Sequence, residues 1–432
     1  MSQPFVKIVQ RYLRWTFFSL LAGTLAGGAA TLFLVLLQWA TSTRDRHPGL
    51  IGLLPAAGLL IGLVYHHYGR DVAGGNNLIL DEIHQPKKVI PIRMAPLILL
   101  GTVMTHLFGG SAGREGTAVQ MGASLSDQLS SFFKIEPDER KILLVAGAGA
   151  GFGAAIGAPW AGVVFGMEVV YIGKLRLFAW FECLIASFTG TFVTILLQAP
   201  HSIYPRIQQV DYDLKTFLIV VLFGSLSGIT ALSFAGFTHF LEGLIRRAIH
   251  YPPFKPLAGG LLIVLLYRLE GSTLYAGLGI PVIQEALSRP STLQVPLLKG
   301  FFTALTLASG FKGGEFIPLV FIGTTLGSAL SAFFNVGTPL LAALGFSAVF
   351  AGASNTPIAS AIMTMELFGP EIGGYAAAAC LASYYFSGYK GIYRSQRVAR
   401  SKHHRFIALW SYLGKRTGRL SGNAGAKNRF KP

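Results

Sequence analysis

The chain has 432 residues, of which 52% are hydrophobic and only 13% are charged, and its mean hydropathy is +0.53. These proportions exclude a soluble globular protein and a disordered chain, so we interpret it as an integral membrane protein. A formal net charge of +17 is also typical of nucleic-acid-binding proteins, but here the stretches that contain basic residues and no acids lie at the two ends of the chain.

Both ends of the chain are basic. Residues 1–14 contain three Lys or Arg and no acid, and residues 390–432 contain twelve Lys or Arg and no Asp or Glu. An excess of Lys and Arg marks the cytoplasmic flanks of membrane segments. We therefore expect both termini in the cytoplasm, with the tail, residues 396–432, in contact with anionic lipid. A regulatory or nucleic-acid role for this tail is the alternative.

Apolar runs of membrane-spanning character follow one another between the two ends. They lie at residues 15–40, 50–67, 142–172, 177–199, 215–240, 257–268, 296–309, 316–334, 338–352 and 371–387. Several are too short, or too interrupted by Gly and Pro, to be simple spanning helices, and the chain contains 52 glycines. The sequence therefore predicts an all-α membrane protein with tightly packed, tilted and partly re-entrant helices.

The most informative segment is Gly110–Gly116, with the sequence GSAGREG, which stands between two apolar stretches. A carboxylate at membrane depth is costly, so Glu115 is a functional candidate. Glycines leave backbone N–H groups uncovered, and at a helix start such groups attract anions. We predict an anion site for which Glu115 competes. A structural ion pair with Arg114 is the alternative, which the different directions of adjacent side chains on a helix disfavour.

The sequence also contains an internal repeat at an offset of about 200 residues, because residues 145–169 resemble residues 343–367. In each segment a proline precedes a glutamate by nine positions. The two pairs are Pro159 with Glu168 and Pro357 with Glu366. Since the two glutamates are equivalent under the repeat, we expect them to serve helix packing and backbone capping rather than to form a catalytic pair.

A second pair of segments keeps the same offset. Residues 113–122 (GREGTAVQMG) align with residues 314–323 (GEFIPLVFIG), which sets Glu115 against Phe316. We therefore divide the membrane part into a first repeat, residues 15–198, a polar linker, residues 199–213, and a second repeat, residues 214–395. If each half crosses the membrane an odd number of times, the halves are inverted and bind substrate near the midplane. Shared helix packing alone is the alternative.

Other motifs carry no chemistry. Gly149, Gly151 and Ala154 have the spacing of a dinucleotide-binding fingerprint, but no strand and helix alternation surrounds them. The chain has no phosphate-binding G-x-x-x-x-G-K-[ST] loop and its histidines lack metal-ligand spacing, so we expect no nucleotide, metal or other cofactor. Cys183 and Cys380 lie in apolar stretches, where packed thiols are expected rather than a disulfide.

Four segments together resemble the signature segments of the CLC family of anion channels and anion/proton antiporters. They are GREGT at 113–117, DERKILLVAGAGAGFGAAIGAPWAGVVFGME at 138–168, GFKGGEFIPLVFIGTTLG at 310–327 and NTPIASAIMTMELFG at 355–369. The resemblance runs in order over about residues 15–400. It implies a CLC-type inverted-repeat bundle with one pore per subunit, assembled as a homodimer in the cell membrane of a prokaryote.

Within this resemblance, Glu115 is similar to the gating glutamate, whose deprotonated form occupies the anion pocket and whose protonation releases it. Chloride-handling members usually have GSGIP before the first short helix and proline after the gate. This chain instead has AGGNNLILDEIH at 73–84 and Thr117, as in the fluoride-exporting branch. Asn76 is the best match to the anion-coordinating serine, and Asn77 is a one-residue alternative. Simple capping of the following helix is the competing interpretation.

The resemblance also assigns the rest of the anion site. It comprises the backbone at Gly113, the backbone N–H groups of Phe316 and Ile317, the phenyl ring of Phe316, and Tyr393 as the central tyrosine. Phe316 is kept as in chloride-type members, which tempers the fluoride assignment. For Tyr393 an aromatic belt at the membrane interface is the alternative.

Proton movement requires a second station besides the gate. The internal glutamate of the family's chloride antiporters is replaced here by Val169, whereas Glu315 resembles an acid of the fluoride/proton antiporters. We therefore predict a fluoride/proton antiporter, with Glu315 as the proton relay or, alternatively, as a polar pore-lining residue. A chloride/proton antiporter and a passive chloride channel remain alternatives. A membrane enzyme has no support, because no nucleophile, base and orienting group can be assembled from the motifs.

Overall fold

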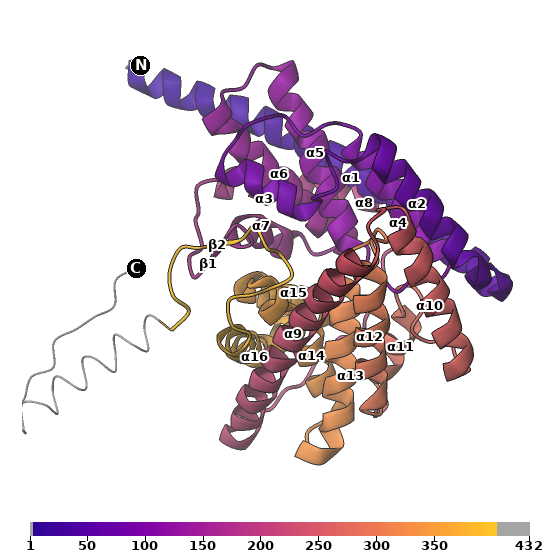
Figure 1. The fold of residues 1–432 in the computed structure, drawn as a ribbon. Helices are drawn as coiled ribbons and strands as arrows, with labels where there is room; N and C mark the ends of the chain where they lie inside the picture. The colour runs from indigo at the N-terminus through magenta and orange to yellow at the C-terminus, as the bar shows by residue number, and fades with distance from the viewer. Residues whose placement is uncertain (1–2, 404–432) are drawn as a thin grey trace, which may run out of the picture.

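The computed structural model describes residues 3–403, and nearly all of its regular structure is helical (Figure 1). The first half contains α1 (Gln3–Arg46), η1 (Pro48–Leu53), α2 (Leu54–Tyr68), α3 (Asn76–His84), α4 (Met94–Leu107), α5 (Glu115–Phe132), α6 (Pro137–Ile156), α7 (Pro159–Glu168), β1 (Tyr171–Ile172) and α8 (Trp180–Leu196). The second half contains α9 (Leu214–Ala248), α10 (Phe254–Glu270), α11 (Ile280–Ala286), α12 (Gln294–Ala308), α13 (Phe316–Phe334), α14 (Thr338–Ser354), α15 (Pro357–Phe368), η2 (Pro370–Ile372), α16 (Gly373–Phe386) and β2 (Arg397–Val398). The prediction of an all-α membrane protein is confirmed.

The helices differ widely in length. The stretches long and apolar enough to cross a membrane are 7–46, 48–68, 214–248 and 316–334 among the described residues, while α4, α8, α14 and α15 are shorter apolar helices. Helix α1 has 44 residues, about twice the length that a bilayer requires, and it runs through the basic segment that we had separated as residues 1–14. The division at residue 14, which marks where the chain leaves the membrane, stays a proposal.

One predicted apolar run is divided in two. Residues 142–172 do not form a single helix, because α6 ends at Ile156 and α7 begins at Pro159. Gly157 takes a φ of 81°, a left-handed conformation that ends α6, and proline at the first position of α7 needs no backbone hydrogen-bond donor. This interruption between Ile156 and Pro159 gives two shorter helices in place of one long one.

The two halves occupy separate regions in Figure 1, with α1–α8 in the upper part of the view and most of α9–α16 in the lower part. Their helix starts correspond, since α5 begins at Glu115 and α13 begins at Phe316. Residues 199–213 contain no helix or strand, and α9 starts after Asp213, whose carboxylate accepts a hydrogen bond from Thr216 N. These positions support the two-repeat interpretation, which stays a proposal.

The two repeated glutamates cap helices across the halves. Glu168 accepts hydrogen bonds from the backbone N–H groups of Ile358 and Ala359 at 3.1 and 2.8 Å, at the start of α15. Glu366 accepts equivalent bonds from Trp160 and Ala161 at 2.9 and 2.8 Å, at the start of α7. The expected role in backbone capping is confirmed, and each half supplies the cap of the other.

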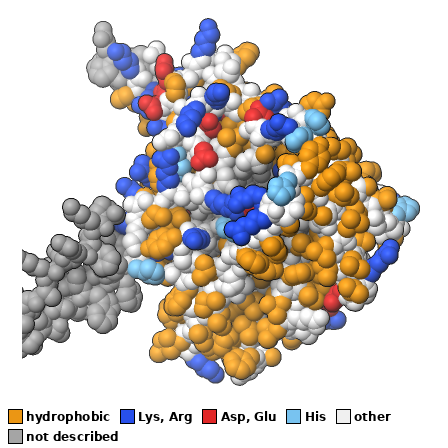
Figure 2. Space-filling model, in the orientation of Figure 1, with side chains coloured by type: hydrophobic (Ala, Val, Ile, Leu, Met, Phe, Trp, Pro, Cys, Tyr) orange, Lys and Arg blue, Asp and Glu red, His pale blue; other side chains and the backbone are white. Residues whose placement is uncertain are grey.

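The outer surface is suited to lipid. Figure 2 shows hydrophobic side chains over much of the lower and right-hand parts of the visible face, with Lys and Arg gathered mainly in its upper and central parts. Large apolar residues are exposed along α1, α8, α9 and α10, including Trp39, Phe192, Leu218 and Leu261. In water such a surface would drive aggregation, whereas in a bilayer it contacts acyl chains. Both cysteines are buried and unpaired, as expected.

Candidate anion site and gate

Two helix starts meet at a backbone bridge between the halves. Gly113 N donates to Gly314 O at 2.6 Å, and Gly314 N donates to Gly113 O at 2.8 Å. Helices α5 and α13 begin two residues after these glycines, so their N-terminal N–H groups, which have no partner within their helices, converge on one region. Converging helix N-termini create a positive potential that favours an anion.

The bridge corrects the role that we expected for Gly113. The backbone of Gly113 was expected to contribute to the anion site, but its N–H is already given to Gly314 O. Glycine is still required at this position, because a Cβ on Gly113 would lie 2.9 Å from Gly314 O and 3.0 Å from Ile317 N. Gly113 therefore holds the two helix starts together and does not itself offer a donor.

Glu115 is the first residue of α5 and is almost completely buried, with 1% of its surface exposed. Its carboxylate accepts hydrogen bonds from Arg114 Nε at 3.1 Å and from Arg114 N at 3.3 Å. The sequence argument against this pair was wrong, because Arg114 precedes the helix and can fold back on its neighbour. Arg114 also donates to Ser202 Oγ at 3.3 Å, so the pair is anchored to the linker between the halves.

The short helix α3 presents both asparagines to the same cavity, but in different ways. Gly75 is the N-cap residue and no side chain caps the helix, so neither asparagine has the capping role that we considered. The donor atom of Asn76, Nδ2, lies 3.2 Å from where a Cβ on Gly116 would be, so it points to the start of α5, while its acceptor Oδ1 is buried and has no hydrogen-bond partner among the described residues. Asn77 Oδ1 accepts a hydrogen bond from Ser395 N at 3.0 Å. Asn76 is therefore the better placed of the two for an anion.

Asn76, Asn77, Gln120, Glu315 and Tyr393 line one cavity of about 450 Å³. A second cavity of about 160 Å³ adjoins it and also contacts Asn77 and Glu315. We call the two cavities together the vestibule. Tyr393 is 8% exposed and lines the vestibule, so it does not belong to an aromatic belt. Glu115 lines neither cavity.

Glu315 connects the vestibule to the gate. A Cβ on Gly116 would lie 3.8 Å from Glu315 Oε2, which places this carboxylate beside the start of α5, one residue from Glu115. Glu315 is the N-cap residue of α13, yet its side chain makes no capping hydrogen bond. The carboxylate is therefore accessible from the vestibule and close to the gating segment.

The walls of the vestibule are mainly cationic. Basic side chains that line it are Arg246, Lys255, Lys312 and Arg394, and the acids are Glu242 and Glu315. Arg394 forms an ion pair with Glu242, and the Lys312 ammonium lies 3.8 Å from the centre of the Tyr65 ring. A cavity lined with an excess of positive charge concentrates small anions.

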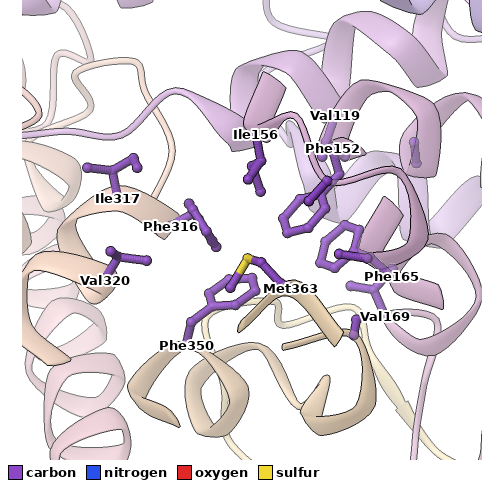
Figure 3. Close-up of a cluster of buried hydrophobic side chains, with 14 of the residues drawn as sticks. Val119, Phe152, Ile156, Phe165, Val169, Phe316, Ile317, Val320, Phe350 and Met363 are labelled. Atoms are coloured by element: carbon purple, nitrogen blue, oxygen red, sulfur yellow. The ribbon is translucent and has the colours of Figure 1, made fainter. Parts of the chain in front are cut away.

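Phe316 and Ile317 lie at the start of α13, but their side chains face the protein interior and line neither cavity. The Phe316 ring packs edge-to-face against Phe350 and Phe152, with ring centres 4.6 and 5.5 Å apart (Figure 3). Phe152 stacks in turn on Phe165 at 4.0 Å. The aromatic cluster fixes the start of α13, and the N–H groups of this first turn stay oriented toward the gate region.

Val169 occupies an apolar space where chloride antiporters of the resembled family place an acid. Apart from Asn76 and Tyr393, this space is lined by hydrophobic residues: Ile79, Leu80, Ile83, Val119, Ala148, Phe165 and Val169. Its volume is about 20 Å³, which leaves little room for water. A proton path therefore finds no side chain to carry it at this point.

Sequence reasoning missed the Glu242–Arg394 pair and the Lys312–Tyr65 contact. Glu242 lies in the long apolar helix α9, so the cost of a carboxylate at membrane depth could have marked it as it marked Glu115. Its partner Arg394 is 152 residues away, and no local pattern predicts that contact.

The comparison with known proteins is decisive for the family. A family model described as voltage gated chloride channel matches residues 57–388 of the chain. The chain belongs to this family, the CLC family. A protein of Pseudomonas syringae pv. tomato named chloride/fluoride channel protein is 48% identical to it over 398 residues, which cover 91% of this chain and 88% of that protein. The recognition from sequence is thus confirmed.

Three further proteins are similar to this chain. The crystal structure of a CLC-type fluoride/proton antiporter superimposes with a TM-score of 0.87 at 33% identity, covering 90% of this chain and 98% of that one. An H⁺/Cl⁻ exchange transporter of Vibrio parahaemolyticus is 26% identical over 379 residues, 80% of each chain. The fold of a slow cyanobacterial Cl⁻/H⁺ antiporter is also similar, with a TM-score of 0.75 at 20% identity.

Proposed function

We propose that this CLC protein is a secondary transporter that exports fluoride across the cell membrane in exchange for protons. The observation that carries the proposal is the position of Glu315 and Asn76, which line one cavity and both approach Gly116, next to Glu115. The names of the relative from Pseudomonas and of the antiporter structure support the same assignment. Neither an enzyme active site nor a cofactor is part of it.

In this proposal the vestibule receives the anion. Its excess of cations attracts fluoride, and Asn76 and Tyr393 bind it below the helix starts of α5 and α13. An amide offers two N–H donors where a serine offers one O–H, which favours a small anion that gives up its hydration reluctantly. Thr117 has no acid-base role in this proposal. Its hydroxyl lies 2.8 Å from Thr102 Oγ1, and this hydrogen bond fixes α5 against α4.

Glu115 and Glu315 carry the proton in turn. Deprotonated Glu115 competes with the anion for the positive helix starts, and the Arg114 guanidinium holds it in its present position. Protonation cancels both attractions, so the neutral side chain can move and the anion can pass. Glu315, at the vestibule and beside the start of α5, then accepts the proton and passes it to the vestibule. This route needs no acid at Val169.

Ion efflux from liposomes tests the proposal. Purified protein is reconstituted, and external fluoride, chloride and pH are followed with electrodes under an imposed anion gradient. Fluoride efflux faster than chloride efflux, with proton flux in the opposite direction, is the expected result. Glu115→Gln should block or uncouple exchange, because a neutral isostere cannot take up and release a proton. Chloride flux equal to or faster than fluoride flux would overturn the fluoride assignment.

A chloride transporter is the second candidate, and Phe316 favours it because chloride-type members keep this residue. A passive channel is distinguished in the same assay, since it would conduct anions without any response to a proton gradient. A full rate of coupled exchange by Glu115→Gln would remove Glu115 from the mechanism altogether.

We further propose that the protein is a homodimer with both termini in the cytoplasm. The neighbouring helices α7, α8, α15 and α16 all carry exposed large apolar side chains. These are Trp160, Phe188, Phe192, Ile195, Ile358 and Leu381. Such a surface is suited to a second subunit or to lipid. Light-scattering mass of the detergent-solubilised protein and protease access to a C-terminal tag in oriented vesicles test these two points.

A further inference from the structure

The linker between the halves is fixed more firmly than a simple connection requires. Residues 199–213 contain no helix or strand, and a loop that only joins two elements can stay loose at little cost. Three hydrogen bonds nevertheless fix its first part to three different helices: His201 Nε2 to Ala154 O of α6 at 2.8 Å, Gln284 Nε2 of α11 to Ile203 O at 2.9 Å, and Ile207 N to Phe368 O of α15 at 2.7 Å. The defined position of this segment requires an explanation.

Tyr204 anchors the same segment in the protein interior. It is buried, its ring packs edge-to-face against Phe346 with ring centres 5.0 Å apart, and it lies 5.7 Å from the Phe368 ring. The Phe346 ring in turn lies 6.4 Å from that of Phe316, the first residue of α13. The linker is thereby attached to the aromatic cluster that fixes one of the two helix starts at the gate.

Ser202 stands between these anchors and reaches the other helix start. Its Oγ accepts a hydrogen bond from Arg114 Nη2 at 3.3 Å, while Arg114 Nε donates to Glu115 Oε1 at 3.1 Å. The guanidinium uses a different nitrogen for each bond, so it is held between the serine and the glutamate. A free arginine side chain has many rotamers, and each hydrogen bond removes part of that freedom. Ser202 therefore limits how far Arg114 moves away from Glu115.

Arg114 is also the cation that pairs with Glu115 within residues 3–403. The other titratable groups that act on this pair or lie beside it are His201, Tyr204, Glu315 and Tyr393. Burial raises the pKa of Tyr204 to about 12, with Arg114 opposing and Glu115 adding to the rise, and burial lowers the pKa of His201. Both linker side chains are thus favoured in their neutral forms. The charge that Glu115 meets from the side of the linker is that of Arg114.

We propose that Ser202 is a positioning residue of the gate, which holds Arg114 against Glu115 and so sets the pH at which the gate opens. A carboxylate that is paired with a guanidinium takes up a proton less readily than a free one. Without the hydroxyl the guanidinium spends part of its time away from Glu115, and the gate is protonated at higher pH. The linker is then part of the gate rather than a simple connection. This inference rests on the proposed function in one respect, the role of Glu115 as the gate.

Anion flux from liposomes at a series of pH values, equal on both sides, tests the proposal. The anion is fluoride or chloride, whichever the protein carries faster. Flux falls as pH rises, because fewer gates are protonated, and the midpoint of that fall is the readout. Ser202→Ala should move the midpoint to higher pH by about half a unit, a part of the roughly one to three units that a neighbouring opposite charge contributes.

Two further variants serve as controls. Ser202→Thr keeps the hydroxyl and should restore the midpoint of the parent protein. Ser233→Ala, at an exposed position of α9, removes a hydroxyl that bonds only within its own helix, and it is the matched control. The unfolding temperature of each variant is measured alongside, since a purely structural role of Ser202 would lower this temperature without moving the midpoint.

A double-mutant cycle shows whether Ser202 acts through Arg114. Arg114→Gln should move the midpoint further in the same direction. Adding Ser202→Ala to it should produce no additional shift, because the guanidinium that the hydroxyl positions is gone. A shift of equal size with and without Arg114 would overturn the proposal, since the hydroxyl would then act on the gate by another route. If Arg114→Gln does not fold, Ser202→Ala against Ser202→Thr still decides.

The remaining outcomes separate this inference from the proposed function. Full coupled exchange by Glu115→Gln would remove the gate, and with it both proposals. Blocked or uncoupled exchange in Glu115→Gln, together with an unchanged midpoint in Ser202→Ala, would overturn this inference alone. The same shift in Ser202→Thr as in Ser202→Ala would also overturn it, because the hydroxyl would then not be the group responsible.

Discussion

Asn77 Oδ1 accepts a hydrogen bond from the backbone N–H of Ser395 at 3.0 Å, across 318 residues of sequence. This bond ties α3, which presents Asn76, to the segment that presents Tyr393. Two polar groups from opposite ends of the chain are thereby held on one cavity. In the proposed site the neighbouring asparagines therefore have different roles, Asn76 toward the anion and Asn77 toward the protein, and substitutions should separate them.

We expect Asn76→Leu to reduce fluoride turnover by tenfold or more while leaving the unfolding temperature nearly unchanged, because Asn76 Oδ1 has no protein partner to lose. Asn77→Leu should instead destabilise the fold by about 1 kcal/mol, the usual worth of one hydrogen bond, with a smaller effect on turnover. Liposome flux and thermal unfolding of the same preparations check both statements. The reverse pattern would assign the anion to Asn77.

Glu315→Gln should slow proton flux more than it slows fluoride binding, because it removes the titratable group between the vestibule and the gate. Glu242→Gln is the control: Glu242 lines the same cavities, but its carboxylate is paired with Arg394. Simultaneous recording of pH and fluoride in liposomes gives the coupling ratio of each variant. Unchanged coupling in Glu315→Gln would make Glu315 a pore-lining residue without proton traffic.

The capping glutamates should matter for stability and little for transport chemistry. Each accepts two backbone hydrogen bonds at a helix start. Glu366→Ala leaves the first N–H groups of α7 without their cap, and a loss of about 2 to 3 kcal/mol is expected. Glu366→Gln keeps one acceptor oxygen and should lose less. Equilibrium unfolding in mixed micelles measures both, and flux per folded protein should stay within twofold of that of the parent protein.

Stability should depend on pH through Lys402. Its pKa in the fold is about 7 and that of an unfolded lysine is about 10.4, so between these values the unfolded chain binds more protons and stability rises with pH. Lys402 lines a cavity of about 250 Å³, and the other charged or titratable groups that line it are Glu168, Tyr171, Lys174, Tyr384, Tyr385 and Arg400. Lys402→Met removes only the lysine. Its unfolding temperature should exceed that of the parent protein at pH 6, and the difference should shrink toward pH 10, in lipid-free detergent.

Much of this site was open to prediction because it is encoded locally. The glycines and the acid of residues 110–116 indicate a helix start from the local sequence alone. The repeat, with its offset of about 200 residues, aligns residue 115 with residue 316, and the two helix starts do meet in the structure. Capping by Glu168 and Glu366 could also be predicted from the repeat, because equivalent residues of the two halves have equivalent structural roles.

The errors concern groups whose partners are far away or whose direction depends on a turn. The N–H of Gly113 is bonded to Gly314 O, and the Arg114 side chain contacts Glu115. Both residues precede α5, so the regular geometry of the helix does not determine their directions. The Ser395 N–H that engages Asn77 comes from a segment without regular structure. Backbone direction in such segments is set by tertiary packing, for which a single sequence carries no periodic signal.

The exchanged glutamate caps have a consequence for the origin of the fold. Each half leaves the start of one of its own helices unfinished and completes that of the other half. Two separate half-length chains related by a twofold axis would form the same pair of contacts. Fusion of such an ancestral pair through a linker like residues 199–213 would keep the four hydrogen bonds that Glu168 and Glu366 accept, and would only join the two chains into one.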